Sequence, residues 1–158
     1  MIDYIKMQIN IIKCVNKERK KMKVPKGVWQ WDGDFLLITA DGYRGYRFWK
    51  NDVVINPETL LMHGASETFN QIFDDSQAEP IVKTDRLEMI KFKQKKTRCR
   101  VFEFEGTGKV AKCDERYVTE WGDDVTFKKN PNVYHGPVFV YDPHDVLIGL
   151  IMPVGNGR

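Results

Sequence analysis

The strongest indication of architecture in this chain is one stretch, Phe35-Leu36-Leu37-Ile38-Thr39-Ala40-Asp41-Gly42-Tyr43-Arg44. Its first half is an apolar run rich in aromatic and branched residues, which predicts a strand. Asp41-Gly42 is typical of a turn, so the chain is expected to reverse before a further strand at residues 46–49. Upstream, residues 28–31 lead into Asp32-Gly33-Asp34, a hairpin-type turn. The stretch therefore lies inside an antiparallel sheet.

Residues 4–22 have the period of an amphipathic helix. Their apolar positions recur at helical spacing, at Ile5, Ile9, Ile12 and Val15. The polar positions are rich in lysine, above all in the second half, where positive charge favours the C-terminal end of a helix. Pro25 ends the helical pattern. An initial strand within residues 2–9 fits the same residues, and the sequence leaves the two open.

Residues 57–80 are predicted to form a helical insertion between two groups of strands. Asn56 is a plausible N-cap and Pro57 suits a first helical position. A helix is expected over residues 58–73, with Gly64 dividing it. Acidic residues and Pro80 then mark a loop.

The second half of the chain is predicted to repeat the pattern of strands and helix. The expected elements are strands over 87–93 and 100–105, a helix over 114–121, and strands over 125–128, 137–141 and 147–154. Cys113 or Asp114 would cap the helix and Gly122 would stop it. Turns at Asn130-Pro131 and Asp142-Pro143 separate the closing strands.

This order contains a βαβββ unit twice, provided that the first strand lies in the N-terminal segment. It predicts an α+β fold with two helices packed on a curved antiparallel sheet, interrupted by the helical insertion 57–80. A length of 158 residues fits one domain with its own core, so we expect a single domain over residues 1–158. The residues themselves show no repeat, and the duplication is one of architecture alone.

The composition is that of an ordinary globular protein. Hydrophobic residues make up 42% and the net charge is +3, which excludes a chain disordered throughout. Three cysteines without a CxxC pair argue against a disulfide framework or a zinc site, and they predict reduced thiols in the cytoplasm. No apolar run approaches the roughly 18 residues that span a bilayer, so no membrane partner is expected.

No arrangement typical of catalysis is found in the sequence. The three histidines are scattered, and no nucleophile has an identifiable base. Gly106-Thr107-Gly108-Lys109 lacks the full spacing of a phosphate-binding loop. Asp32, Asp34 and Asp41 flank one strand and could hold a cation, which leaves a metal-dependent enzyme as one alternative, but turn carboxylates explain them more simply. We therefore expect a non-enzymatic protein with no cofactor and no metal.

The chain closes with a second motif, Leu150-Ile151-Met152-Pro153-Val154. Together with Thr39-Ala40-Asp41-Gly42-Tyr43-Arg44, it resembles the signatures of the bacterial sliding clamp family, the β subunit of DNA polymerase III. Residues 114–127 and 137–140 also look like the last helix and closing strands of that family. The resemblance implies a DNA-clamp-like fold and a role in DNA replication or repair.

In that family the two motifs line a pocket that grips short peptides of polymerases and repair proteins. An apolar cleft with a few polar groups suits such a role. The resemblance implies a peptide-binding pocket formed by Gly42, Tyr43, Arg44, Met152, Pro153 and Val154. The chain departs from the family pattern where Gly45 replaces a leucine, Gly155 an arginine and Ala40 a threonine. These departures bear on peptide binding more than on the fold.

Sliding clamps encircle duplex DNA, and the resemblance implies phosphate contacts from the basic half of the first helix. The expected DNA-binding residues are Lys13, Lys17, Arg19, Lys20 and Lys21. A second basic cluster spans residues 91–100, whereas the helix over 114–121 is acidic; a short charge run is most often a solvated surface.

The resemblance also bears on assembly. A ring needs about six such domains, which implies a homo-oligomer. The alternative is a monomeric protein-interaction module that uses the clamp fold without encircling DNA.

Overall fold

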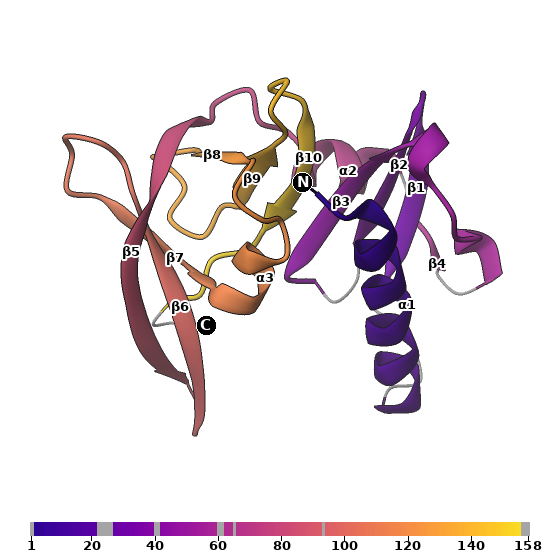
Figure 1. The fold of residues 1–158 in the computed structure, drawn as a ribbon, viewed down its shortest axis with the longest axis horizontal. Coiled ribbons are helices and arrows are strands. Elements are labelled where there is room, and N and C mark those ends of the chain that lie inside the picture. The colour runs from indigo at the N-terminus through magenta and orange to yellow at the C-terminus, as the bar shows by residue number, and fades with distance from the viewer. Residues whose placement is uncertain are drawn as a thin grey trace. The chain divides into compact units, whose positions relative to one another are not determined.

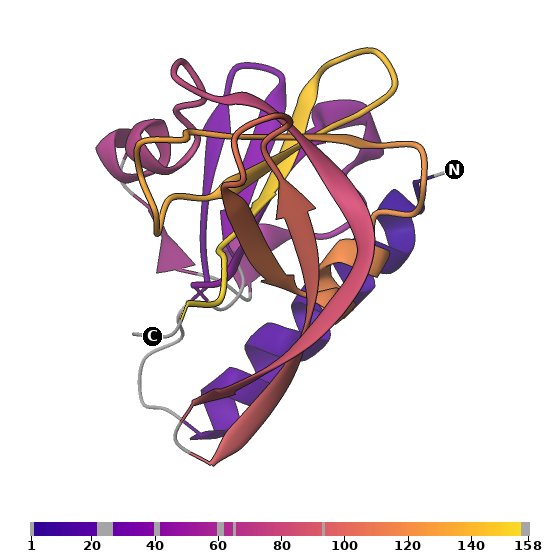
Figure 2. The same ribbon diagram turned by 90° about the vertical axis from the view of Figure 1, so that its left-hand side faces the viewer.

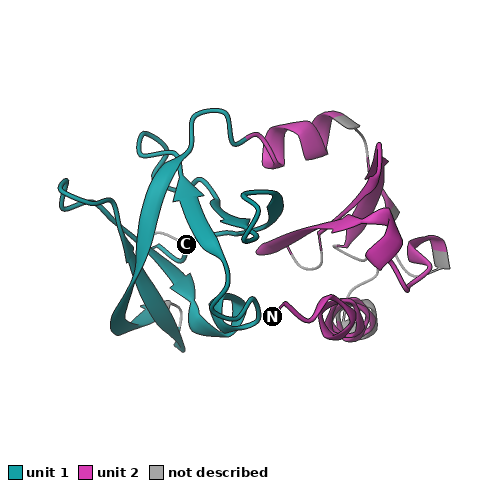
Figure 3. Cartoon of the chain, turned by 45° about the horizontal axis from the view of Figure 1, so that its top comes forward, with its two compact units in different colours: residues 1, 75–158 teal, residues 2–74 magenta. Residues whose placement is uncertain are grey.

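The structure is a computed structural model that describes residues 2–21, 27–39, 42–59, 62–64, 66–92 and 94–155. The chain divides into two compact units, unit 1 over residues 75–158 and unit 2 over residues 2–74 (Figure 3). Each unit has its own buried side chains, and the single domain over residues 1–158 stays a prediction. Within the described ranges, no helix is both long and apolar enough to cross a membrane.

The chain is α+β, with three α-helices among the described residues and strands that are mostly antiparallel (Figure 1). The elements of unit 2 are α1 (Tyr4–Lys21), β1 (Val28–Asp32), β2 (Phe35–Thr39), β3 (Arg44–Trp49), the 3-10 helices η1 (Lys50–Asp52) and η2 (Pro57–Thr59), β4 (Met62–His63) and α2 (Ser66–Ile72). The elements of unit 1 are β5 (Glu79–Phe92), β6 (Lys95–Glu103), β7 (Val110–Asp114), α3 (Glu115–Thr119), β8 (Thr126–Lys129), β9 (Val138–Tyr141) and β10 (Leu147–Ile151). The predicted class is confirmed, and the clamp fold within that class stays a prediction.

The strands of unit 2 have the order β4-β1-β2-β3. β1 and β2 form the predicted hairpin, in which Asp32 pairs with Phe35. Gly33 in its turn has a φ of +58°, a conformation that glycine adopts without a steric penalty. The rings of Tyr4 and Phe48 meet edge to face with centroids 6.2 Å apart, an arrangement that aromatic pairs favour. This contact packs α1 against β3.

α1 confirms the predicted helix, but its buried face only partly overlaps the expected one. The buried side chains are Met7, Gln8, Ile11 and Val15. Ile5 and Ile9, which were expected to face the core, are 57% and 45% exposed. The buried face is thus displaced from the expected apolar stripe by roughly one residue position, which corresponds to about 100° around the helix axis.

Of the two alternatives that the sequence leaves open for residues 2–9, the structure has the helix and not the strand. The chain is already helical from Tyr4. Its buried side chains recur at helical spacing, whereas those of a strand would recur at every second residue. Among the described residues, the first βαβββ unit therefore lacks its leading strand.

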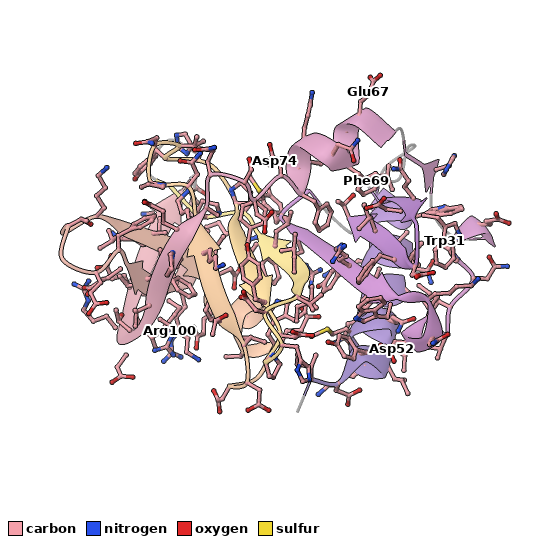
Figure 4. All side chains as sticks on the ribbon, turned by 90° about the horizontal axis from the view of Figure 1, so that it is seen from above. Trp31, Asp52, Glu67, Phe69, Asp74 and Arg100 are labelled. Carbon is pink, nitrogen blue, oxygen red and sulfur yellow. The ribbon has the colours of Figure 1, made fainter. Side chains whose placement is uncertain are left out.

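The insertion is helical in two short pieces. Oδ1 of Asn56 accepts a hydrogen bond from the N–H of Glu58 at 3.1 Å, as an N-cap does, but η2 ends at Thr59 and α2 begins only at Ser66. Gly64 lies between them as predicted, and a Cβ there would overlap the ring of Phe69. Figure 4 shows Phe69 pointing from α2 toward the strands and Glu67 pointing away.

The strands of unit 1 form a curved sheet with the order β10-β9-β8-β5-β6-β7. The beginning of β5 pairs with β8 and the remainder pairs with β6, so the sheet bends around one core (Figure 2). Beyond β10, the N–H of Val154 donates to the carbonyl oxygen of Lys112 in β7 at 2.7 Å. The two ends of the strand order therefore meet.

α3 lies within the helix predicted over residues 114–121. The side chain of Asp114 caps it by accepting from the N–H of Arg116 at 3.0 Å, and Gly122 follows it with a φ of +72°. Arg100 of β6 donates two hydrogen bonds to Glu115, at 2.9 Å and 2.6 Å, which attaches α3 to the sheet. The order β7-α3-β8-β9-β10 is a βαβββ order, as predicted for the second half of the chain, but its leading strand is β7, which was not predicted, and not the strand expected over residues 100–105.

Candidate functional site

A small pocket in unit 1 brings the C-terminal motif together with two other segments. Its volume is about 60 Å³, and it is lined by residues 110–112 of β7, by Tyr134 and His135 from the loop after β8, and by residues 153–155. Pro153 and Val154, two of the predicted pocket residues, thus line a pocket. Met152, the third from this motif, is half-buried and is not part of the lining.

A buried lysine holds the loop that carries Tyr134 and His135. Lys129 is only 3% exposed, and its Nζ donates to the carbonyl oxygens of Val133 at 2.8 Å and Gly136 at 2.7 Å. Burial lowers the pKa of Lys129 to about 8, because the charged form loses its hydration. Lys129 thereby fixes the backbone on both sides of the two pocket residues.

The mouth of the pocket is aromatic on one side and backbone on the other. Tyr134 is 68% exposed, and its ring lies edge to face with that of His135 at a centroid distance of 4.8 Å. Gly155 is buried, and a Cβ there would lie 3.3 Å from Cε1 of His135. This arrangement can accept an apolar side chain beside an exposed tyrosine ring.

The other predicted wall of the peptide pocket lies in unit 2. Gly42 has a φ of +82°, Tyr43 is exposed, and Nη2 of Arg44 contacts Sγ of Cys14 at 3.2 Å. The six predicted residues are thus divided between the two units, and their assembly into one pocket stays a prediction.

The predicted DNA-binding residues are only partly described. Lys13 and Lys17 are exposed on α1, and helical spacing places Lys6 on the same side. Among the described residues, no carboxylate pairs with these three lysines. The side chains of Arg19, Lys20 and Lys21 lie outside the described part of the chain. The three described lysines form an exposed basic face of α1.

The aspartate cluster considered for a cation is also partly described. Asp32 and Asp34 are exposed at the β1–β2 turn, and Asp41 lies outside the described residues. In the ranges that the structure covers, no group of three His, Cys, Asp or Glu side chains is placed to hold a metal ion.

Sequence reasoning did not find Tyr134, His135 or Lys129. A lysine at the end of a predicted strand is normally exposed, and nothing in its local sequence indicates the carbonyl oxygens that it binds. The available signal was the segment 130–136 between two short predicted strands, since binding residues are often found on such loops.

We compared the chain with models of protein families, with curated proteins and with solved structures, and none of the three comparisons gave a match.

Proposed function

We propose that this chain is a non-enzymatic, sliding-clamp-like protein of DNA replication or repair, located in the cytoplasm, which binds short peptides of partner proteins. The observation that carries the proposal is the pocket between β7, the loop of Tyr134 and residues 153–155. It is built in part from the motif that resembles a peptide-binding signature. The proposal therefore joins a sequence resemblance to a pocket.

The chemistry of the pocket suits one apolar anchor of an extended peptide. Val110 and Pro153 supply apolar surface, and the exposed ring of Tyr134 offers area that a bound peptide would cover. Tyrosine is enriched among residues that dominate binding energy because it combines a large rigid ring with a hydroxyl. Tyr134 is thus the residue most able to contribute affinity.

Tyr134→Ala is expected to weaken peptide binding by at least about tenfold, which corresponds to about 1.4 kcal/mol. The loss follows from removal of the ring at the mouth of the pocket. Linear peptides would be selected from a displayed library with the full chain as bait, and their affinities measured by fluorescence polarisation.

Val133→Ala is the matched control, because Val133 is exposed on the same loop and does not line the pocket. Its affinity for the selected peptides should equal that of the unaltered chain. Equal losses in the two variants, or a library that yields no binder, would contradict the proposed pocket.

A second candidate function is association with duplex DNA, and the observation that favours it is the basic face of α1. Lys6, Lys13 and Lys17 are exposed together, and phosphate contacts need only positive charge at a suitable distance. The form implied by this function is a homo-oligomer that encloses DNA, and the alternative to it is a monomeric protein-interaction module that does not encircle DNA.

Lys13→Gln/Lys17→Gln is expected to make the negative slope of log K against log [salt] for a labelled DNA duplex shallower by about two, since each phosphate contact contributes about −0.9. Light scattering with and without duplex at low salt then separates the two forms. A closed oligomer supports encirclement, whereas a monomer under both conditions leaves the interaction module.

A further inference from the structure

The β5–β6 hairpin carries three cations on one exposed face. Lys91 lies directly opposite Lys96, and Met89 lies opposite Arg98. All four side chains are exposed, Met89 to 60%. Side chains at directly paired positions project from the same side of a sheet. We refer to Met89, Lys91, Lys96 and Arg98 as the ribbon face.

Three other cations of unit 1 near this hairpin are paired with carboxylates. Salt bridges of 2.6 Å join Arg86 to Glu103, Arg100 to Glu115 and Lys112 to Glu88.

The ribbon face differs in this respect. As far as the chain is described, no carboxylate pairs with Lys91, Lys96 or Arg98. Like charges placed directly opposite each other destabilise a sheet, so the Lys91–Lys96 pair carries an unfavourable energy that a bound anion would remove.

We propose that the ribbon face binds the phosphate backbone of duplex DNA. Figure 2 shows β5 and β6 running side by side as a long ribbon to their hairpin turn. Two strands lie about 4.8 Å apart, and the major groove of B-DNA, about 12 Å wide, admits such a ribbon. Along β6, Lys96 and Arg98 are about 6.7 Å apart, a regular spacing that suits a regularly charged polymer.

Three arguments favour duplex DNA over other polyanions as the partner of the ribbon face. None of its four side chains is aromatic, so it offers no ring on which the bases of a single strand could stack. The major groove of double-stranded RNA is too narrow and deep for side chains to enter. Met89 alone supplies little apolar surface for insertion into a lipid interface.

The ribbon face shares no residue with the peptide pocket or with the basic face of α1, and it deepens the DNA association proposed above. The test titrates the full chain with a short labelled DNA duplex over a series of NaCl concentrations. Lys91→Gln/Lys96→Gln is expected to make the negative slope of log K against log [salt] shallower by about two, because two phosphate contacts are lost. Lys50→Gln/Lys109→Gln removes the same charge from exposed positions elsewhere and should leave the slope unchanged.

The outcomes separate this site from α1. If Lys91→Gln/Lys96→Gln keeps the full slope while Lys13→Gln/Lys17→Gln makes it shallower, the ribbon site is wrong and the α1 site stands. Equal losses in the ribbon variant and the Lys50/Lys109 control would show diffuse surface charge and overturn the proposal. Tighter binding to single-stranded DNA or to anionic vesicles than to duplex would also overturn it.

Thermal melting without DNA provides a second readout. At low salt the Lys91→Gln/Lys96→Gln variant should melt at or above the temperature of the unaltered chain, because the repulsion between the two lysines is gone. A lower melting temperature would show that the pair is stabilised within the protein itself, and it would contradict the argument for a bound anion.

Discussion

Lys129→Met is expected to weaken peptide binding at the pocket by at least about tenfold, or about 1.4 kcal/mol. The methionine fills a similar space but cannot donate to the carbonyl oxygens of Val133 and Gly136, which Lys129 binds at 2.8 Å and 2.7 Å. Without those bonds, the loop backbone that positions Tyr134 and His135 is no longer held in place. Fluorescence polarisation measures the affinity, and hydrogen exchange of the amides in residues 133–136 reports whether the loop has opened.

The same substitution has a pH signature. The pKa of Lys129 is about 8 in the folded protein and 10.5 in the absence of burial. Between these values the unfolded state binds more protons, so the free energy of unfolding rises with pH. Below pH 8 both states are protonated and the contribution is flat. At about 1.4 kcal/mol for each pKa unit, the unaltered chain should gain up to about 3 kcal/mol relative to Lys129→Met between pH 8 and 10.5.

Lys128→Met is the matched control on the neighbouring position of β8. Lys128 is half-buried, and its Nζ lies 3.8 Å from Oδ1 of Asp145 and 4.7 Å from the centre of the Tyr141 ring. Its loss should leave the pocket affinity and the pH dependence of stability close to those of the unaltered chain. If the two variants behave alike in both measurements, Lys129 does not hold the pocket loop.

The parts of the fold that could be predicted are those whose causes are local in sequence. The β1–β2 hairpin follows from Gly33, which the turn requires at positive φ. α3 follows from the capping side chain of Asp114 and from Gly122. β5 was expected only from residue 87 but begins at Glu79. Its first residues pair with β8, which lies far along the chain, and no local pattern indicates that pairing.

The error in the buried face of α1 has the same origin. Ile5 and Ile9 are more apolar than Gln8, so periodicity alone places them toward the core. Gln8 is buried instead because its amide binds backbone groups 44 and 46 residues away. In the pocket, Pro153 and Val154 came from a motif that could be recognised, whereas Tyr134 and Lys129 depend on contacts between segments. Propensity and spacing carry no information on such contacts.

Gln8→Leu is expected to lower the free energy of unfolding by about 2–4 kcal/mol, since each orphaned backbone group costs about 1–3 kcal/mol. Gln8 is fully buried. Its Nε2 donates to the carbonyl oxygen of Asp52 at 2.7 Å, and its Oε1 accepts from the N–H of Val54 at 2.8 Å. Leucine keeps most of the volume and neither bond. Thermal melting should shift down by roughly 5–15 °C, and the amide of Val54 should exchange faster.

Gln30→Leu makes the same chemical change where the opposite result is expected. Gln30 is also buried, but its Oε1 has no hydrogen-bond partner among the described residues, so leucine removes a buried oxygen that is not satisfied. This variant should unfold at the same or a higher denaturant concentration than the unaltered chain. If the two leucine variants lose equal stability, burial of a glutamine alone sets the cost, and the link from α1 to the segment after β3 does not contribute to stability.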